Sequence, residues 1–112
     1  MNSPYAYISD LQQQIPKIPT DSIVSRTIHS DDDVKVILFG FAAGQELSEH
    51  TSAREAVLEF LRGDAVVTLG SVAEGGATVA ARPGTLIRMA PRLPHSVHAV
   101  TETLMLLTMV GA

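Results

Sequence analysis

The stretch GQELSEHTSAREAVLEFLRG, residues 44–63, joins a polar half that contains a histidine to an alternating apolar half, between two glycines. In the apolar half, Ala56, Leu58 and Phe60 are spaced two residues apart, so a β-strand would place them on one face. The same parity runs back to His50 unless a bulge interrupts it. The stretch therefore predicts a strand with one apolar face, preceded by a histidine that points to the interior.

Short apolar runs of this kind fill the chain from residue 23 onward. The breaks between them are SDDD, AAG, RGD, AEGG, RPG and APRLP, each rich in Gly, Pro, Ala or Asp. The expected strands are 23–29, 34–42, 56–61, 65–69, 77–81, 86–89, 96–101 and 104–110. Short strands joined by frequent turns predict an all-β barrel or sandwich.

The first 22 residues have a different character. YISDLQQQIP predicts a short helix or helical turn that ends at Pro16, and PKIPTD predicts an extended connector, because proline disfavours helix at the residue before it. A chain of 112 residues, 46% of them hydrophobic, fits one compact domain. We therefore expect an N-terminal extension, residues 1–22, followed by a single barrel, residues 23–112.

The composition excludes several classes of partner and site. With a net charge of −4 and eight scattered Lys and Arg, the chain has no basic stripe for nucleic acid or for an acidic membrane surface. It has no cysteine, so any metal would be held by histidine, carboxylate or water. Because the N-terminus lacks a signal-peptide pattern and the apolar run LMLLTMV is too short to span a bilayer, we expect a cytoplasmic protein.

The size of the chain and one of its strands favour a homodimer. A domain this small buries a modest core and often gains stability by pairing with a second copy. The stretch VKVILFGF, residues 34–41, is apolar on both faces apart from Lys35. Such a strand is typical of one that is covered by the core on one side and by a partner chain on the other.

A second histidine-containing stretch, HSVHAVT, lies at residues 95–101. By strand parity His95 shares a face with Val97 and Ala99, while His98 falls on the opposite face. We therefore expect His95 to point into the barrel and His98 to point outward. Three methionines are expected to fill the core or a pocket wall: Met89, Met105 and Met109.

The two histidine stretches together resemble the two sequence motifs of a small single-domain cupin, of the RmlC-like or cupin 2 conserved barrel type. The first motif has a glycine, five residues, His-x-His, a glutamate and a later glycine. Gly44, His50 and Gly63 fall in register with it. Ser52 stands at the second histidine and Ala56 at the glutamate, so the motif is degenerate at two metal-ligand positions.

The second motif matches at Gly84, Pro94 and His95. Three positions depart from it: Ala90 in place of proline, Arg92 in place of glycine and Ala99 in place of asparagine. The resemblance covers roughly residues 34–110. It implies a double-stranded β-helix or jelly-roll barrel, usually dimeric, with its site inside the barrel mouth.

The resemblance also implies where a metal would bind. Family members hold a divalent ion such as zinc, iron, manganese or nickel with three histidines and a carboxylate. Here only His50 and His95 remain, and Glu46, which shares parity with His50, is the candidate third ligand. Two imidazoles leave most of the coordination of a divalent ion to water, so we expect weaker affinity than at a complete site.

Three functions stay open at this stage. The first is a protein that binds a small molecule in an apolar pocket, with His50, Ser52 and His95 as polar contacts. The second is a metal-dependent cupin enzyme of oxygenase or isomerase type. The third is a sensory or structural module that acts through a partner protein, because no helix-turn-helix segment is present. Whether the protein is an enzyme stays undecided: no Ser/His/Asp arrangement, phosphate loop or carboxylate pair is evident, and binding is better supported than catalysis.

Overall fold

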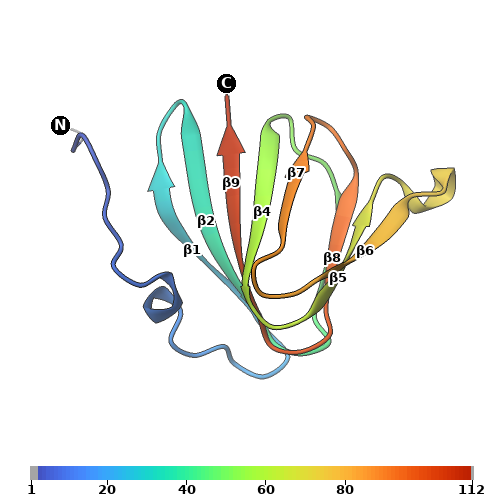
Figure 1. The fold of residues 1–112 in the computed structure, drawn as a ribbon, viewed down its shortest axis with the longest axis horizontal. Helices are drawn as coiled ribbons and strands as arrows, with labels where there is room; N and C mark the ends of the chain where they lie inside the picture. The colour runs from blue at the N-terminus through green and yellow to red at the C-terminus, as the bar shows by residue number, and fades with distance from the viewer. Residues whose placement is uncertain (1–2, 112) are drawn as a thin grey trace.

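The computed structural model describes residues 3–111, which form two antiparallel sheets that face each other as a barrel (Figure 1). One sheet has five strands in the order β1-β2-β9-β4-β7, and the other has four in the order β3-β8-β5-β6. The strand bounds are β1 Ile23–Ser30, β2 Val34–Phe41, β3 Glu46–His50, β4 Glu55–Arg62, β5 Ala65–Leu69, β6 Ala77–Ala81, β7 Leu86–Met89, β8 His95–Ala99 and β9 Thr103–Val110.

The predicted all-β jelly-roll architecture is confirmed, and most strands fall where the alternation placed them. Strands β5, β6 and β7 have the predicted bounds. The prediction missed β3, because ELSEH carries one apolar residue among polar ones and has no period-2 apolar pattern. It also began β8 one residue late and ended it two residues late, since β8 spans His95–Ala99.

The core lies between the two sheets. Ala56, Leu58 and Phe60 on β4 face it and are at most 2% exposed, as their parity predicted. They pack with buried residues from both sheets: Phe41, Ala65, Val67, Ala81, Met89, Val97, Ala99 and Met105. Burying this set removes apolar surface from water and supplies the main force that holds the sheets together.

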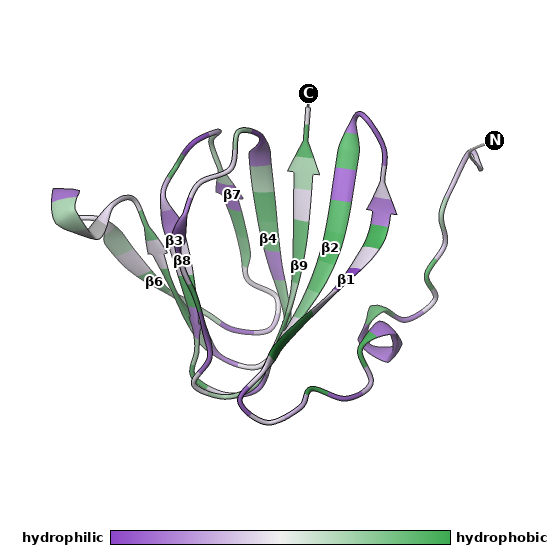
Figure 2. Ribbon diagram, turned by 180° about the vertical axis from the view of Figure 1, so that it is seen from behind, coloured by the Kyte–Doolittle hydropathy of each residue, from purple (hydrophilic) through white to green (hydrophobic). Residues whose placement is uncertain are grey.

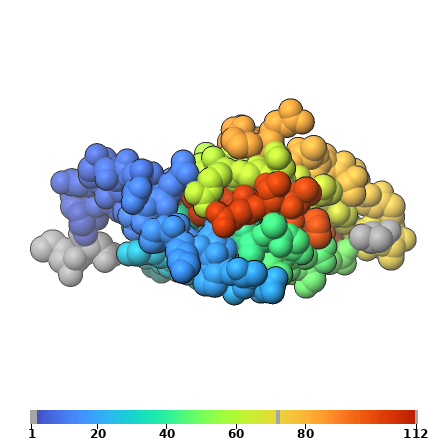
Figure 3. Space-filling model, turned by 90° about the horizontal axis from the view of Figure 1, so that it is seen from below, coloured from blue at the N-terminus to red at the C-terminus, as the bar shows by residue number. Residues whose placement is uncertain are grey.

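The segment before β1 packs on the outer face of the five-stranded sheet. A 3-10 helix, η1 (Leu11–Gln14), is capped by Asp10, whose side chain accepts a hydrogen bond from the Gln12 amide at 3.0 Å. Ile15 and Ile18 are then buried against Leu38 and Leu104. Figure 3 shows this N-terminal part as a lobe at one side of the barrel. No helix within residues 3–111, η1 and η2 (Val72–Glu74) included, is long and apolar enough to cross a membrane.

Candidate functional site

Strands β3 and β8 are neighbours in the four-stranded sheet and bring His50 and His95 together. The two residues are directly paired in the antiparallel register. Their ring centroids lie 4.2 Å apart, with an angle of 59° between the ring planes. His50 and His95 are 45 residues apart in the chain, and they meet here as one pair of touching imidazoles.

Hydrogen bonds to the backbone orient both rings. His50 Nδ1 donates to the Ser48 carbonyl at 2.8 Å, and His95 Nδ1 donates to the Leu93 carbonyl at 2.9 Å. A carbonyl oxygen can only accept, so the proton of each neutral imidazole is on Nδ1. Each Nε2 therefore keeps its lone pair, which can accept a hydrogen bond or bind a metal ion.

The two rings differ in their contact with solvent. His95 is buried, at 5% exposure, whereas His50 is exposed. Burial lowers the pKa of His95 below its ordinary 6.5, and the hydrogen bond to Leu93 opposes this shift. Repulsion from His50, when that ring takes up a proton, lowers the pKa of His95 further. The pair therefore offers one neutral imidazole on the interior side and one that meets the solvent.

Ser52 lies just beyond the pair, in the loop between β3 and β4. Its hydroxyl donates to the Met109 sulfur at 3.7 Å and accepts from the Arg54 amide at 3.2 Å. Its carbonyl accepts a hydrogen bond from the Arg92 amide at 2.6 Å. These contacts hold the β3–β4 loop, the β7–β8 loop and the end of β9 together beside the histidines.

The structure does not bring Glu46 to the histidine pair. Glu46 is paired with His98, and its carboxylate lies 3.8 Å from His98 Nδ1 on the outer face, where both side chains are about half exposed. The register of β3 shifts between Leu47 and His50, and Leu47 packs against the core. This bulge breaks the parity from which a common face for Glu46 and His50 was expected. His98 points outward as predicted.

Sequence reasoning missed the contact of Met109 with Ser52. Met109 and Met89 sit on either side of Ala56 in the register, on β9 and β7, and all three face the interior. The sequence placed Met89, Met105 and Met109 in the core or a pocket wall. It could not show that Met109 would contact Ser52, because this contact joins residues 57 positions apart.

The described residues do not fit a divalent metal site of the kind that the resemblance implies. Among residues 3–111, no group of three or more His, Cys, Asp and Glu side chains is placed to hold a metal ion. The Ser52 hydroxyl is hydrogen-bonded to the Met109 sulfur, and the Ala56 side chain has no atom that could bind a metal. Two imidazoles alone leave a divalent ion short of its usual three or four protein ligands.

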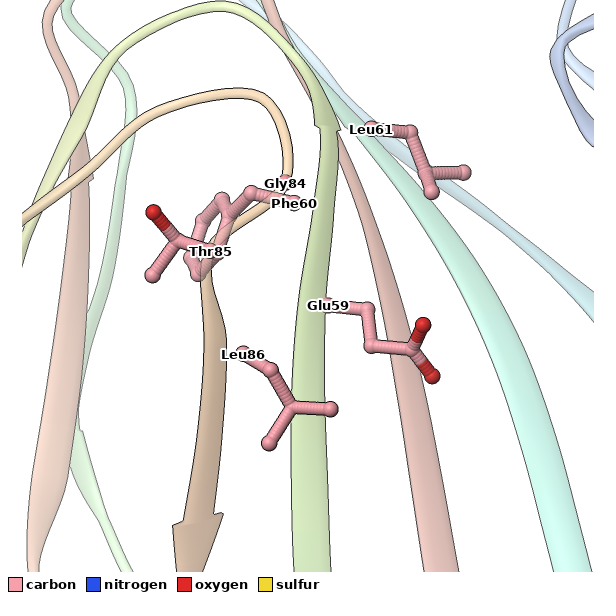
Figure 4. Close-up of a pocket in the computed structure, with 6 residues that line it drawn as sticks. All are labelled: Glu59, Phe60, Leu61, Gly84, Thr85 and Leu86. Atoms are coloured by element: carbon pink, nitrogen blue, oxygen red, sulfur yellow. The ribbon is translucent and has the colours of Figure 1, made fainter.

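A separate surface pocket of about 250 Å³ lies where β4 meets the turn before β7 (Figure 4). Phe60 and Thr85 lie on one side of β4 there, and Glu59 and Leu61 lie on the other. Glu59 is its single charged lining residue, and the two histidines lie elsewhere. Because it gathers few polar groups, we place the candidate site at the histidine pair instead.

No family model matches this sequence, and no curated protein matches it. Solved structures do. A conserved protein of unknown function from Streptococcus pyogenes is 30% identical, with a TM-score of 0.82, covering 100% of this chain and 93% of that one. A cupin superfamily protein from Desulfitobacterium hafniense is 20% identical, with a TM-score of 0.83 and coverage of 100% and 97%. An RmlC-like cupin from Desulfovibrio desulfuricans is 27% identical, with a TM-score of 0.73 and coverage of 86% and 91%.

Proposed function

Because this chain has the fold of the cupins that it resembles, we propose that it binds a small organic molecule at the open end of its barrel. His50, Ser52 and His95 make the polar contacts. The observation that carries the proposal is the touching pair of imidazoles, each oriented through Nδ1 so that Nε2 keeps its lone pair. A few convergent polar groups beside apolar side chains are among the features by which small-molecule sites are recognised.

The chemistry of the pair restricts the ligand. Each neutral imidazole presents an acceptor at Nε2, so the ligand should carry hydroxyl or N–H donors. The buried His95 resists protonation, because burial lowers its pKa. The remainder of the ligand would contact apolar side chains such as Met109 and Leu69, the latter paired with His95 on β5.

The experiment is a histidine-selective NMR titration of metal-free protein. The chain has four histidines, so nitrogen-15 spectra of the imidazoles contain few signals and can be assigned by substitution. Small polyols, hydroxy acids and amides are added one at a time. The proposal predicts that a binding compound shifts Nε2 of His50 and of His95 together, because both rings meet in one site.

His29 and His98 serve as internal controls. His29 Nε2 lies 2.7 Å from the Asp31 carboxylate, and His98 faces Glu46 on the outer side of the barrel. Neither histidine therefore belongs to the site. Compounds that shift only these two histidines, or a screen in which no compound shifts the pair, would contradict the proposed function.

A further inference from the structure

We propose that Lys35 makes the site selective for hydroxy acids, because it binds the carboxylate of a ligand whose hydroxyl group is held by the histidine pair. The inference rests on the proposed function, since it names the class of small molecule that the same site would take. It starts from the single charged residue of β2.

The register of β2 places Lys35 on the inner face of the barrel. Phe39 and Phe41, which have the same parity as Lys35, pack in the core between the sheets. Lys35 is paired with Met109 on β9, and Met109 is packed against the same core. The pairing of β2 with β9 has no register shift, so the parity holds from Phe41 back to Lys35. The one charged side chain of β2 therefore belongs to the interior face.

Lys35 and the histidine pair are connected through Met109 and Ser52. Ser52 follows His50 by two residues, and its hydroxyl donates to the Met109 sulfur at 3.7 Å. Met109 is in turn the strand neighbour of Lys35. Neighbouring strands are about 4.8 Å apart, a distance that the flexible four-carbon stem of lysine can span. A ligand of a few carbon atoms that contacts the histidines can therefore meet the ammonium group with its other end.

The charge of Lys35 has no ion-pair partner among residues 3–111. The residue is partly buried. Lysine side chains that leave the surface are usually paired, because removing an unpaired charge from water is costly. A carboxylate of the ligand would supply the missing partner and would form charge-assisted hydrogen bonds with the ammonium group.

The acidic turn that precedes β2 opposes an anionic ligand only weakly. Asp31, Asp32 and Asp33 are exposed, and exposed charges interact weakly through water. The Asp31 carboxylate accepts hydrogen bonds from two amides of its own turn and lies 2.7 Å from His29 Nε2. Asp31 and His29 line a surface pocket together with Val36, which is on the opposite face of β2 from Lys35.

The two kinds of polar group select one class of ligand. Nε2 of each histidine accepts a hydrogen bond, so it binds a hydroxyl or N–H group. The ammonium group of Lys35 can only donate, and its charge favours a carboxylate as the acceptor. A small hydroxy acid carries both groups on one short chain.

The test compares hydroxy acids with their amides in metal-free protein at low salt. Glycolate, lactate, glycerate and gluconate are each paired with the primary amide, which keeps the hydroxyl groups and removes the charge. Affinity is measured from the shifts of the imidazole nitrogens of His50 and His95. We expect at least one acid to bind about tenfold or more tightly than its amide, because hydrogen bonds to charged groups are the stronger kind. In Lys35→Met the acid should bind no more tightly than the amide.

Lys17→Met is the matched control. Lys17 is the other lysine of the chain and is exposed in the connector before β1, so its replacement should leave the preference for the acid unchanged. Circular dichroism would verify that both variants fold. Equal binding of acid and amide in the wild type, or a preference for the acid that survives Lys35→Met, would overturn the role of Lys35. The proposed function would stand in either case, because the histidine pair still responds. If no compound shifts the pair, both the role of Lys35 and the proposed function fall.

Discussion

The two histidines show how burial sets the chemistry of a side chain. His50 and His95 have the same backbone hydrogen bond from Nδ1, and they touch. They differ in exposure, and the pKa of the buried ring is lowered chiefly by desolvation. A buried neutral imidazole is a dependable acceptor, but it makes the fold sensitive to acid.

Folding stability should therefore fall as the pH drops below 6.5, the ordinary pKa of histidine. The pKa of His95 is lowered in the folded state, so the unfolded chain takes up the proton more readily, and acid favours unfolding. Urea denaturation between about pH 8 and about pH 5 should show the midpoint decreasing toward acid. Asp31, whose pKa is lowered from 3.8 to about 2 chiefly by its hydrogen bond with His29, titrates below this window.

The variant His95→Gln separates this effect from general acid sensitivity. Glutamine keeps a polar group but has no proton to gain, so the midpoint should depend less on pH than in the wild type. The same pH dependence in both proteins would show that His95 is not its source.

Arg92 occupies the position where the second cupin motif has glycine, and it keeps the left-handed backbone, with φ at 66°. A residue with a Cβ is strained there by about 1–2 kcal/mol. Arg92→Gly should therefore stabilise the fold by up to about 1 kcal/mol, because the greater freedom of glycine in the unfolded chain offsets part of the gain. Thermal unfolding of Arg92→Ala is the control, since alanine removes the side chain and keeps the strain. If the glycine variant is no more stable than the alanine variant, backbone strain at this position is unimportant.

Strand β3 is the one strand that the sequence did not predict. Alternation located the strands with one apolar face, but β3 is mainly hydrophilic along its length (Figure 2). Its bulge between Leu47 and His50 has no mark in the sequence, because a bulge is created by pairing with another strand. For this reason the contact of His50 with His95 required the structure, as did the placement of Glu46 outside the site.

The turn between β4 and β5 depends on Gly63. This residue has φ at +85°, and a Cβ added to it would lie 2.0 Å from the Glu102 carbonyl oxygen. Gly63→Ala should lose about 1–2 kcal/mol from the backbone alone, and more from the overlap. Gly84→Ala is the matched control, with φ at +94° and nothing within 4 Å of its added Cβ. In chemical denaturation, the free energy of unfolding of Gly63→Ala should be well below that of Gly84→Ala. Equal losses of unfolding free energy in the two variants would argue against the close approach of Glu102.

The five-stranded sheet has an outer face that is only partly covered. β2 and β9 are apolar along most of their length (Figure 2). Ile15 and Ile18 cover the end near Leu38 and Leu104. The remaining outer apolar face consists of partly exposed residues on β2, β4 and β9: Val34, Val36, Val57, Leu106, Thr108 and Val110. Charged Glu55, Glu59 and Arg88 border these residues on the same face. An apolar surface with a polar rim is typical of a protein–protein interface.

We therefore expect a homodimer that forms through the outer apolar face. Thr108 lies at its centre, between Val36 and Val57 in the register, so Thr108→Arg would place a charge in the interface and should yield monomers. Sedimentation equilibrium measures the mass directly. Thr68→Arg is the matched control, because Thr68 lies on the other sheet between Ser96 and Thr78. A monomeric wild type would contradict this assignment. So would a Thr108→Arg variant that remains a dimer, above all if Thr68→Arg is monomeric.

The sequence predicted the architecture far better than the site. Period-2 alternation and Gly or Pro turns are local features, and they were sufficient to place β5, β6 and β7 and the buried face of β4. The site depends on contacts between distant segments, such as His50 with His95 and Ser52 with Met109. Such contacts follow from sheet register, which no local pattern encodes.

The proposed function requires that the histidine pair binds a small organic molecule. Calorimetry with the best compound from the histidine titration measures this binding in the wild type, His50→Ala and His98→Ala. Both replaced side chains are exposed histidines of the four-stranded sheet, on its inner and outer faces. Loss of one hydrogen bond of about 1.4 kcal/mol should weaken binding about tenfold in His50→Ala and leave His98→Ala unchanged. Equal affinity in all three proteins would contradict the account.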